Sequence, residues 1–426
     1  MLATWAAGCQ RKLTEGLCRD MLRIRRKSMQ IRNSLRQQSL QPFGPPPFAQ
    51  ARLCCTAIYS AFTQGEGLRD GKPVPYEYCL IEELSMKHTL SNHRKTVAIM
   101  AILLLLCILG SFLLGRYPVP LRELLGILGS RLGLPIRSHW TDAMAAAVWN
   151  IRLPRVLLSV LVGACLAAAG ASYQGVFQNP MASPDILGAS AGAGFGAALA
   201  ILLGFSAVGI TLSAFFMSLL TVALVFTVSR HAKGDRILGL VLAGIMVSSL
   251  FQAGTSFIKL AADPNDKLPQ ITYWLMGSLS GTQWSDLGFV LLPMAAGLIP
   301  LLLLRWQLNV ITMGDEEARA MGVNAPQIRL WVVLCSTLVT AASVSVSGMI
   351  GWVGLVIPHM MRRLVGSDFR CLLPASVLGG GIFLLVVDNV SRNLTAAGIP
   401  IGILTAFIGA PFFLWLITGK GDHYER

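Results

Sequence analysis

VAIMAILLLLCILGSFLLG, from Val97 to Gly115, is an apolar run without a single charged side chain. A helix needs about 20 such residues to cross a hydrocarbon core about 30 Å thick, and helices in soluble cores rarely continue that far without a charge. The rest of the chain has the same character, since 54% of its 426 residues are hydrophobic and its mean hydropathy is +0.61. The sequence therefore predicts an all-α, polytopic membrane protein.

Nine further apolar segments predict about ten transmembrane helices in a domain that covers residues 86–426. Their expected ranges are 156–174, 186–204, 207–229, 237–258, 284–304, 328–346, 350–364, 372–391 and 402–418. Lys and Arg gather in the short loops after the fourth, sixth, eighth and tenth spans, all on the side of the termini. Because such loops stay in the cytoplasm, we expect a multi-pass protein of the cell (inner) membrane, with both termini cytoplasmic.

Residues 1–85 form a basic extension without sustained apolar periodicity, and we expect them to be disordered. Residues 1–95 carry +8 of the net charge of +14. Nucleic acid binding would explain such charge in a soluble protein, but beside a first span it is typical of a cytoplasmic flank, so we expect no nucleic acid partner. Met86 opens a basic lead that could itself begin a membrane protein. Two alternatives stay open, a native cytoplasmic tail or translation from Met86.

Enzyme motifs are missing at any plausible aqueous site. GEGLRDGK, from Gly65 to Lys72, comes nearest to a phosphate-binding GxxxxGK[ST] loop but has the wrong spacing. The nine cysteines show neither a CxxC pair nor Cys/His ligand spacing. We therefore expect no catalytic residue, no cofactor and no metal site. If ATP drives this protein, a separate subunit must hydrolyse it.

RWQLNVITMGDEEARAMGVNAPQIR, from Arg305 to Arg329, is the longest polar interruption within the membrane domain. Carboxylates at positions 315–317 favour the start of a short helix, whose positive end they stabilise, and Gly322 favours its end. A second short helix is expected to begin near Pro326. Two surface helices at about 313–328 would make a docking platform for a partner. The alternative is a solvated connector.

Charged residues near the membrane need a partner or a function. Asp388 and Arg392, four residues apart in the ninth span, can pair along one helix face, as structural contacts or as part of an aqueous pathway. Residues 116–155 lie outside by the span count yet contain six arginines. Positive charge on that side suggests a binding role.

Two further motifs are candidates for structure or pathway. Asn179-Pro180 breaks any helix between the second and third spans. His359 follows Pro358 near the end of the eighth span, and a lone histidine there favours a hydrogen-bonded structural role over metal ligation.

Six blocks of the sequence, taken in order, resemble the permease family of ABC importers for ferric siderophores, haem and cobalamin. The resemblance extends from about residue 97 to the end of the chain. This sequence departs from the family pattern at Ile399, where the family often has a polar residue. The blocks are RLPR (Arg152–Arg155), GACLAAAGASYQGVFQNPMASPDILGASAGAG (Gly163–Gly194), WLMGSL (Trp274–Leu279), MGDEEARAMGV (Met313–Val323), GMIGWVGLVIPHMMR (Gly348–Arg362) and IPIGILTAFIGAPFF (Ile399–Phe413).

The resemblance implies the type II ABC importer permease fold and a set of partners. These are two cytoplasmic ATP-binding subunits, an extracytoplasmic substrate-binding protein, and a second permease copy or sister subunit in the lipid bilayer. It implies that Arg152, Arg155 and Arg392 face outward and dock the binding protein. It also implies an ATPase coupling loop, made of Met313, Gly314, Asp315, Glu316, Glu317, Ala318, Arg319, Ala320, Met321, Gly322 and Val323.

The expected function is alternating-access import of an iron-siderophore, with cobalamin or haem as the alternative cargo. The rival of another class is an ion-coupled secondary transporter. Such proteins need an ionisable relay in the membrane, and this chain offers Asp388 with Arg392 and little else.

Overall fold

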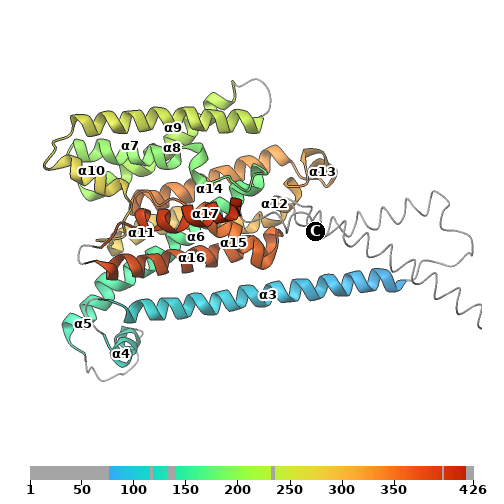
Figure 1. Cartoon of the computed structure of the whole chain (residues 1–426), viewed down its shortest axis with the longest axis horizontal. Helices are drawn as coiled ribbons and strands as arrows, with labels where there is room; N and C mark the ends of the chain where they lie inside the picture. The colour runs from blue at the N-terminus through green and yellow to red at the C-terminus, as the bar shows by residue number, and fades with distance from the viewer. Residues whose placement is uncertain (1–75, 116–118, 132–139, 232–235, 396–397, 419–426) are drawn as a thin grey trace, which may run out of the picture. The chain divides into compact units, whose positions relative to one another are not determined.

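The structure is a computed structural model that describes residues 76–115, 119–131, 140–231, 236–395 and 398–418 (Figure 1). Every regular element in these ranges is a helix, so the expected all-α class is confirmed. The described residues from Tyr76 to Ile417 belong to one compact unit. Most of the extension for which we expect disorder, residues 1–75, lies outside the described ranges. Residues 76–85 differ from that expectation, because they are the helical start of α3.

The helices follow one another with short connections, and each of the ten expected spans corresponds to one of them. The α-helices are α3 (Tyr76–Leu113), α4 (Leu121–Arg131), α5 (Asp142–Ala146), α6 (Leu153–Val176), α7 (Ala189–Leu202), α8 (Ala207–Ser229), α9 (Arg236–Ala261), α10 (Lys267–Leu275), α11 (Trp284–Leu303), α12 (Arg305–Ile311), α13 (Asp315–Ala320), α14 (Ala325–Ser347), α15 (Val353–Val365), α16 (Phe369–Leu394) and α17 (Ile401–Thr418). A π-helix, η1 (Ala147–Arg152), and a 3₁₀-helix, η2 (Pro184–Leu187), complete the set.

Seven helical stretches in the described part of the chain are long and apolar enough to cross a membrane. They belong to α3, α6 with the turns before it, α8, α9, α11, α14 and α16. The other three expected spans are shorter, namely α7, α15 and α17. The fold therefore agrees with about ten membrane helices, three of which fall short of a full span.

The second span begins earlier than its apolar pattern suggests. α5, η1 and α6 form one continuous helical stretch, Asp142–Val176, whereas the sequence predicts a start near residue 156. The π-helical turn lies just before Pro154, which cannot donate a backbone hydrogen bond. Arg152 and Arg155 therefore lie on a helix and not in an outer loop.

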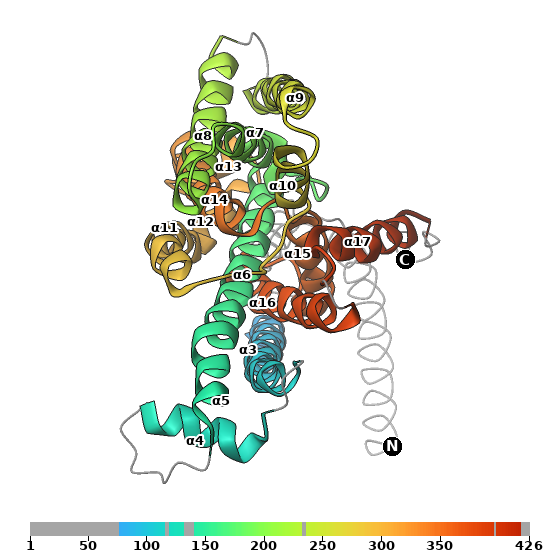
Figure 2. The same ribbon diagram turned by 90° about the vertical axis from the view of Figure 1, so that its left-hand side faces the viewer.

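α6 is the central helix of the bundle and packs against α14, α15 and α16 (Figure 2). Its small residues make this possible. A Cβ atom added at Gly163 would lie 2.2 Å from the carbonyl oxygen of Gly380 in α16, and one at Gly170 would lie 1.8 Å from that of Gly354 in α15. Such close backbone contacts are typical of helix packing in membranes, where small residues lie at the helix interfaces.

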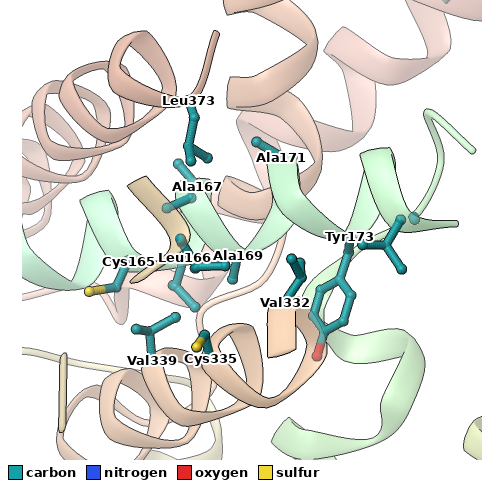
Figure 3. Packing of buried hydrophobic residues seen from close by; sticks show 14 of the residues in the cluster. Cys165, Leu166, Ala167, Ala169, Ala171, Tyr173, Val332, Cys335, Val339 and Leu373 are labelled. Carbon is teal, nitrogen blue, oxygen red and sulfur yellow. The ribbon is translucent and has the colours of Figure 1, made fainter. Parts of the chain in front are cut away.

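Buried side chains fill the space on both sides of α6 (Figure 3). Cys165 and Leu166 face Cys335 and Val339 of α14, and Leu373 of α16 lies on the opposite side of the helix. By contrast, most residues of α3, α8, α9 and α11 are partly or fully exposed in the spanning stretches. An apolar exterior around a packed centre is what a lipid environment or a second membrane subunit requires.

Three of the six sequence blocks meet at one point of the fold, near the start of α17. The backbone N–H of Ser278, in the third block, donates at 2.7 Å to the carbonyl of Ser347, the residue directly before the fifth block. The N–H of Ile401 donates to the carbonyl of Gly277 at 2.8 Å, which joins the sixth block to the third. Gly277 has φ +72, a conformation that strongly favours glycine. These blocks therefore specify backbone contacts between distant segments.

Candidate functional site

The segment between α11 and α14 holds two short helices, α12 and α13, which we call the α12–α13 region (residues 305–324). The expected acidic helix is α13. The expected second short helix near Pro326 is wrong, because the helix that begins at Ala325 is the long α14. Pro326 lies in its first turn, where the missing N–H leaves no hydrogen bond unmade, and the side chain of Asn324 caps it. The second short helix is α12, which precedes α13.

α13 buries one side and exposes the other. Ala318 and Val323 are buried, and Arg329 of α14 pairs with Asp315 at 2.9 Å. Met313 and Gly314 at its start are half-buried. The exposed residues are Asp315, Glu316, Glu317, Arg319, Ala320, Met321 and Gly322. An anchored helix with an acidic exposed face is a surface that another protein can contact.

A buried polar pair, which we call the Asn309–Asp368 node, joins α12 to the start of α16. The Nδ2 of Asn309 donates to Oδ1 of Asp368 at 2.6 Å, and the backbone N–H of Phe369 donates to Oδ1 of Asn309 at 2.8 Å. Oδ1 of Asp368 also accepts from the N–H of Arg370 at 2.9 Å and so caps α16. Asn309 is 5% exposed and Asp368 is 8% exposed.

Sequence reasoning missed this node. Aspartate directly before an apolar helix is an N-cap signal, and Asp368 carries it. Nothing local predicts its partner, because Asn309 lies 59 residues away in the chain.

The loop after α6 also contacts α12. Gln178, with φ +47, donates from Nε2 to the carbonyl of Ile311 at 3.0 Å. The side chain of Asn179 accepts from the N–H of Met181 at 2.9 Å, and Pro180 is half-buried beside it. Asn179 and Pro180 therefore shape the loop that brings Gln178 to α12.

At the other end of α16, Asp388 lies against the start of α6. Its side chain is fully buried, and Arg155 donates to it three times, from Nε at 3.0 and 3.2 Å and from Nη2 at 2.8 Å. The expected pairing of Asp388 with Arg392 is confirmed, but at a longer distance of 3.8 Å. Together with Arg152, these residues form what we call the arginine cluster.

The arginine cluster also holds the end of α3. Nη2 of Arg392 donates to the carbonyl of Ser111 at 2.9 Å and to its hydroxyl at 2.6 Å, and also to Asn389. Nη1 of Arg152 donates to the carbonyl of Phe112. Arg152 is buried, and the side chains of Arg155 and Arg392 are 15% and 13% exposed. These arginines contact groups of their own chain, whereas the resemblance implies that they face outward.

α15 carries the remaining expected site residues. Pro358 is buried and His359 is half-buried. Nη2 of Arg362 donates to Oε1 of Gln174 in α6 at 3.1 Å, and Arg363 lies 5.3 Å from the ring centre of Trp415. Within the described ranges, no group of three His, Cys, Asp or Glu side chains could hold a metal ion.

Comparisons with known proteins match most of the chain. Residues 103–419 match the FecCD transport family. The chain is 40% identical over 315 residues to the molybdate import system permease protein MolB of Haemophilus influenzae, covering 74% of this chain and 92% of MolB. It is 41% identical over 305 residues to the hemin transport system permease protein HmuU of Yersinia pestis, covering 68% and 90%.

A solved structure described as an inward-facing metal-chelate type ABC transporter has a similar fold. It superposes with a TM-score of 0.69 at 38% identity, covering 77% of this chain and 100% of that chain. The family match over residues 103–419 includes both ends of α16, where the Asn309–Asp368 node and the arginine cluster lie.

Proposed function

This chain belongs to the FecCD transport family, and on that premise we propose that it is the permease subunit of an ATP-driven importer of a metal chelate. Its fold is that of a type II ABC importer permease. The observation that carries the proposal is the family match over residues 103–419, within which an exposed acidic helix stands between two spans. The permease provides the path, and separate ATP-binding subunits hydrolyse the ATP.

Within the α12–α13 region, the segment Met313–Val323, which contains α13, is the proposed coupling site. Glu316 and Glu317 are exposed and suit a basic cleft on an ATP-binding subunit. Because Ala318 and Val323 are buried, a displacement of α13 is passed to α12 and α14. ATP binding would draw two such subunits together beneath two permeases, tilt their spans and open the path to one side. The second permease is another copy or a sister subunit.

The arginine cluster is the proposed docking site for the binding protein. Arg155 and Arg392 share one carboxylate, that of Asp388, so this pair of arginines keeps a surplus of positive charge, which attracts acidic side chains of a partner. Docking then requires a partner carboxylate to meet Arg392 or to compete with Asp388 for Arg155. Charges of this kind mainly set the rate of encounter and the register.

The distribution of arginines supports the membrane orientation. Lys and Arg in the short loops on the α13 side favour a cytoplasmic location for that side and for both termini. α13 then faces the ATP-binding subunits, and the arginine cluster lies toward the extracytoplasmic binding protein.

The proposed cargo is a metal chelate, with an iron-siderophore as the main expectation. HmuU is named for hemin and the solved neighbour for metal chelates, which supports this class. MolB, at nearly the same identity, is named for molybdate, so overall identity does not select the cargo. Cobalamin and haem are the alternatives. Binding of each candidate to the purified binding protein would identify it.

Reconstitution tests the function. Vesicles holding this permease with its ATP-binding subunits, supplied with loaded binding protein, should accumulate the chelate only when ATP is present on the α13 side. The ion-coupled alternative depends on Asp388 as a relay, but that carboxylate is fully paired with arginine. Uptake that continues without ATP, and stops when an ionophore removes the ion gradient, would refute the proposal in favour of that alternative.

A further inference from the structure

We infer that the Asn309–Asp368 node is the joint through which movement of the coupling region reaches α16, and that α16 carries this movement to the arginine cluster. The inference rests on the proposed function. It assigns Asn309 and Asp368 a positioning role that goes beyond holding the fold together.

The node is built as a joint of fixed geometry. Each side chain accepts one hydrogen bond from the first turn of α16, and they are joined to each other at 2.6 Å. A buried polar group left without its hydrogen-bond partner lowers the free energy of unfolding by more than the hydrogen bond itself contributes. α12 and the start of α16 therefore move together. A second contact, from Nη1 of Arg305 to the carbonyl of Arg370 at 3.4 Å, joins the same two segments.

α12 has little freedom to move on its own. Its last four residues, 308–311, are buried, and only three residues separate it from α13. Gln178 holds its end to the loop after α6. A force applied to α13 is therefore delivered to the start of α16 and to the end of α6, which are the two helices that meet at the arginine cluster.

α16 connects the two sites directly. Asp368 and Asp388 lie about 30 Å apart along the helix, at 1.5 Å per residue. Between them, Gly380 crosses Gly163 of α6 so closely that a Cβ atom at either position would lie 2.2 Å from the other's carbonyl oxygen. The nearest side-chain atoms at this crossing are the Cβ atoms of Ala167 and Leu384, so the two backbones meet across small groups and α16 can turn about the crossing. Turning α16 at the node then changes the distance between Asp388 and Arg155 of α6.

The two ends are then reciprocally linked, as thermodynamics requires of any two coupled binding sites. Binding-protein docking that shifts Asp388 would change the position of α12, and ATP binding by the subunits that contact α13 would change the strength of docking. The node is the point where this linkage can be cut without touching either partner surface.

Exchange of the two side chains provides the test. Asn309→Asp places two carboxylates together and removes the donor. Asp368→Asn keeps an acceptor for Asn309 and for the N–H of Arg370, so it is the matched control. In the double exchange, the Asn amide at position 368 donates to the carboxylate at 309, which still accepts from Phe369 N–H. All the hydrogen bonds of the node can therefore form again.

Each variant is assembled with its ATP-binding subunits in vesicles, and three quantities are measured: basal ATP hydrolysis, its stimulation by loaded binding protein, and chelate imported per ATP hydrolysed. For Asn309→Asp we expect the rate of basal ATP hydrolysis to stay near that of the unaltered complex. Stimulation by loaded binding protein and import per ATP should each fall about tenfold, because the variant loses about one of the buried hydrogen bonds that couple the two sites. The control and the double exchange should both remain close to the unaltered complex.

Three results would overturn the inference. They are normal import per ATP in Asn309→Asp, a double exchange that fails to assemble, and a double exchange that assembles with its stability restored but its coupling still lost. Asn309→Ala, which removes the amide without adding charge, is measured alongside in case Asn309→Asp does not assemble. It should also lower stimulation more than basal hydrolysis, and equal loss of both would count against the joint. A complex of the unaltered protein that shows no ATP-dependent import would instead refute the proposed function.

Discussion

Asp368 and Asp388 are buried carboxylates at opposite ends of one helix, α16, but their surroundings differ. Asp368 accepts hydrogen bonds from a neutral amide and a backbone N–H. Asp388 faces the guanidinium groups of Arg155 and Arg392, with Arg152 nearby. The first set of contacts holds two segments at a fixed distance, and the second leaves a surplus of positive charge.

The difference fits the two proposed roles. A joint that transmits movement needs short, directional bonds that ionic strength does not weaken. A docking site needs long-range attraction and groups that can change partners, and such attraction is screened by salt. The two ends of α16 therefore differ in the way that a coupling site and a docking site should differ.

The largest expected effect is at the outer end. Asp388→Asn should destabilise the protein by about 3–5 kcal/mol, because it leaves buried guanidinium groups without their counter-charge. Asp368→Asn, the matched change at the other end, keeps its acceptor and should cost about 1 kcal/mol. Thermal unfolding of the purified protein in detergent measures both. Equal losses would show that the two carboxylates are held in the same way, and the comparison would fail.

Charge reversal on α13 should have the next largest effect. Replacing Glu316 and Glu317 together by Lys should lower import at least about tenfold, because their charge no longer fits the ATP-binding subunit. Hydrolysis by the isolated ATP-binding subunit should be unchanged. Reversal of Asp263 and Asp266, exposed acidic residues between α9 and α10, is the control and should leave import intact. If both pairs behave alike, α13 is a solvated connector.

A smaller effect is expected from strain in the turn after α13. Gly322 has φ +77 and no atom near its missing Cβ, so Gly322→Val strains only the backbone, by about 1–2 kcal/mol. Gly281, with φ +81 and equally open space, provides the same change in the loop before α11. Gly322→Val should reduce import per ATP, and Gly281→Val should only lower stability. If both variants lost coupling, the result would contradict a specific role of α13 in coupling.

Removal of residues 1–75 should have the smallest effect. The family match begins at residue 103, and both ends of α16 lie within it. Import by vesicles holding the shortened chain should equal that of the full chain, and we would compare the two at low ionic strength. A defect there would indicate that the basic segment binds anionic lipid or a regulator.

Much of the fold could be predicted from local patterns. Each of the ten apolar runs corresponds to a helix in the structure, and seven stretches in the described residues are long and apolar enough to cross a membrane, because lipid requires each span to satisfy its own backbone hydrogen bonds and to expose apolar side chains. The acidic start of α13 was predicted from the helix dipole, and the pair Asp388–Arg392 from its four-residue spacing. Each of these signals depends on residues within one or two helical turns.

Boundaries and partners were harder to predict. The start of α14 at Ala325 was mistaken for a short helix, since proline in a first turn indicates where a helix begins but not how far it continues. The early start of the second span was missed because a helix can extend past its apolar segment. The outward orientation implied for the arginines overlooked Asp388 as the partner of Arg155, which lies on another helix.

By itself, the sequence determined that this protein is an all-helical membrane permease of a recognisable family, because hydropathy, helix periodicity and family motifs are properties of neighbouring residues. Only the tertiary structure decided which polar groups meet. Arg155 and Asp388 are 233 residues apart, and Asn309 and Asp368 are 59 apart. The first pair forms because glycines let α6 and α16 approach within backbone contact, and the second depends on the packing of α12 against α16. No local pattern encodes these pairings, since they depend on how the whole bundle packs.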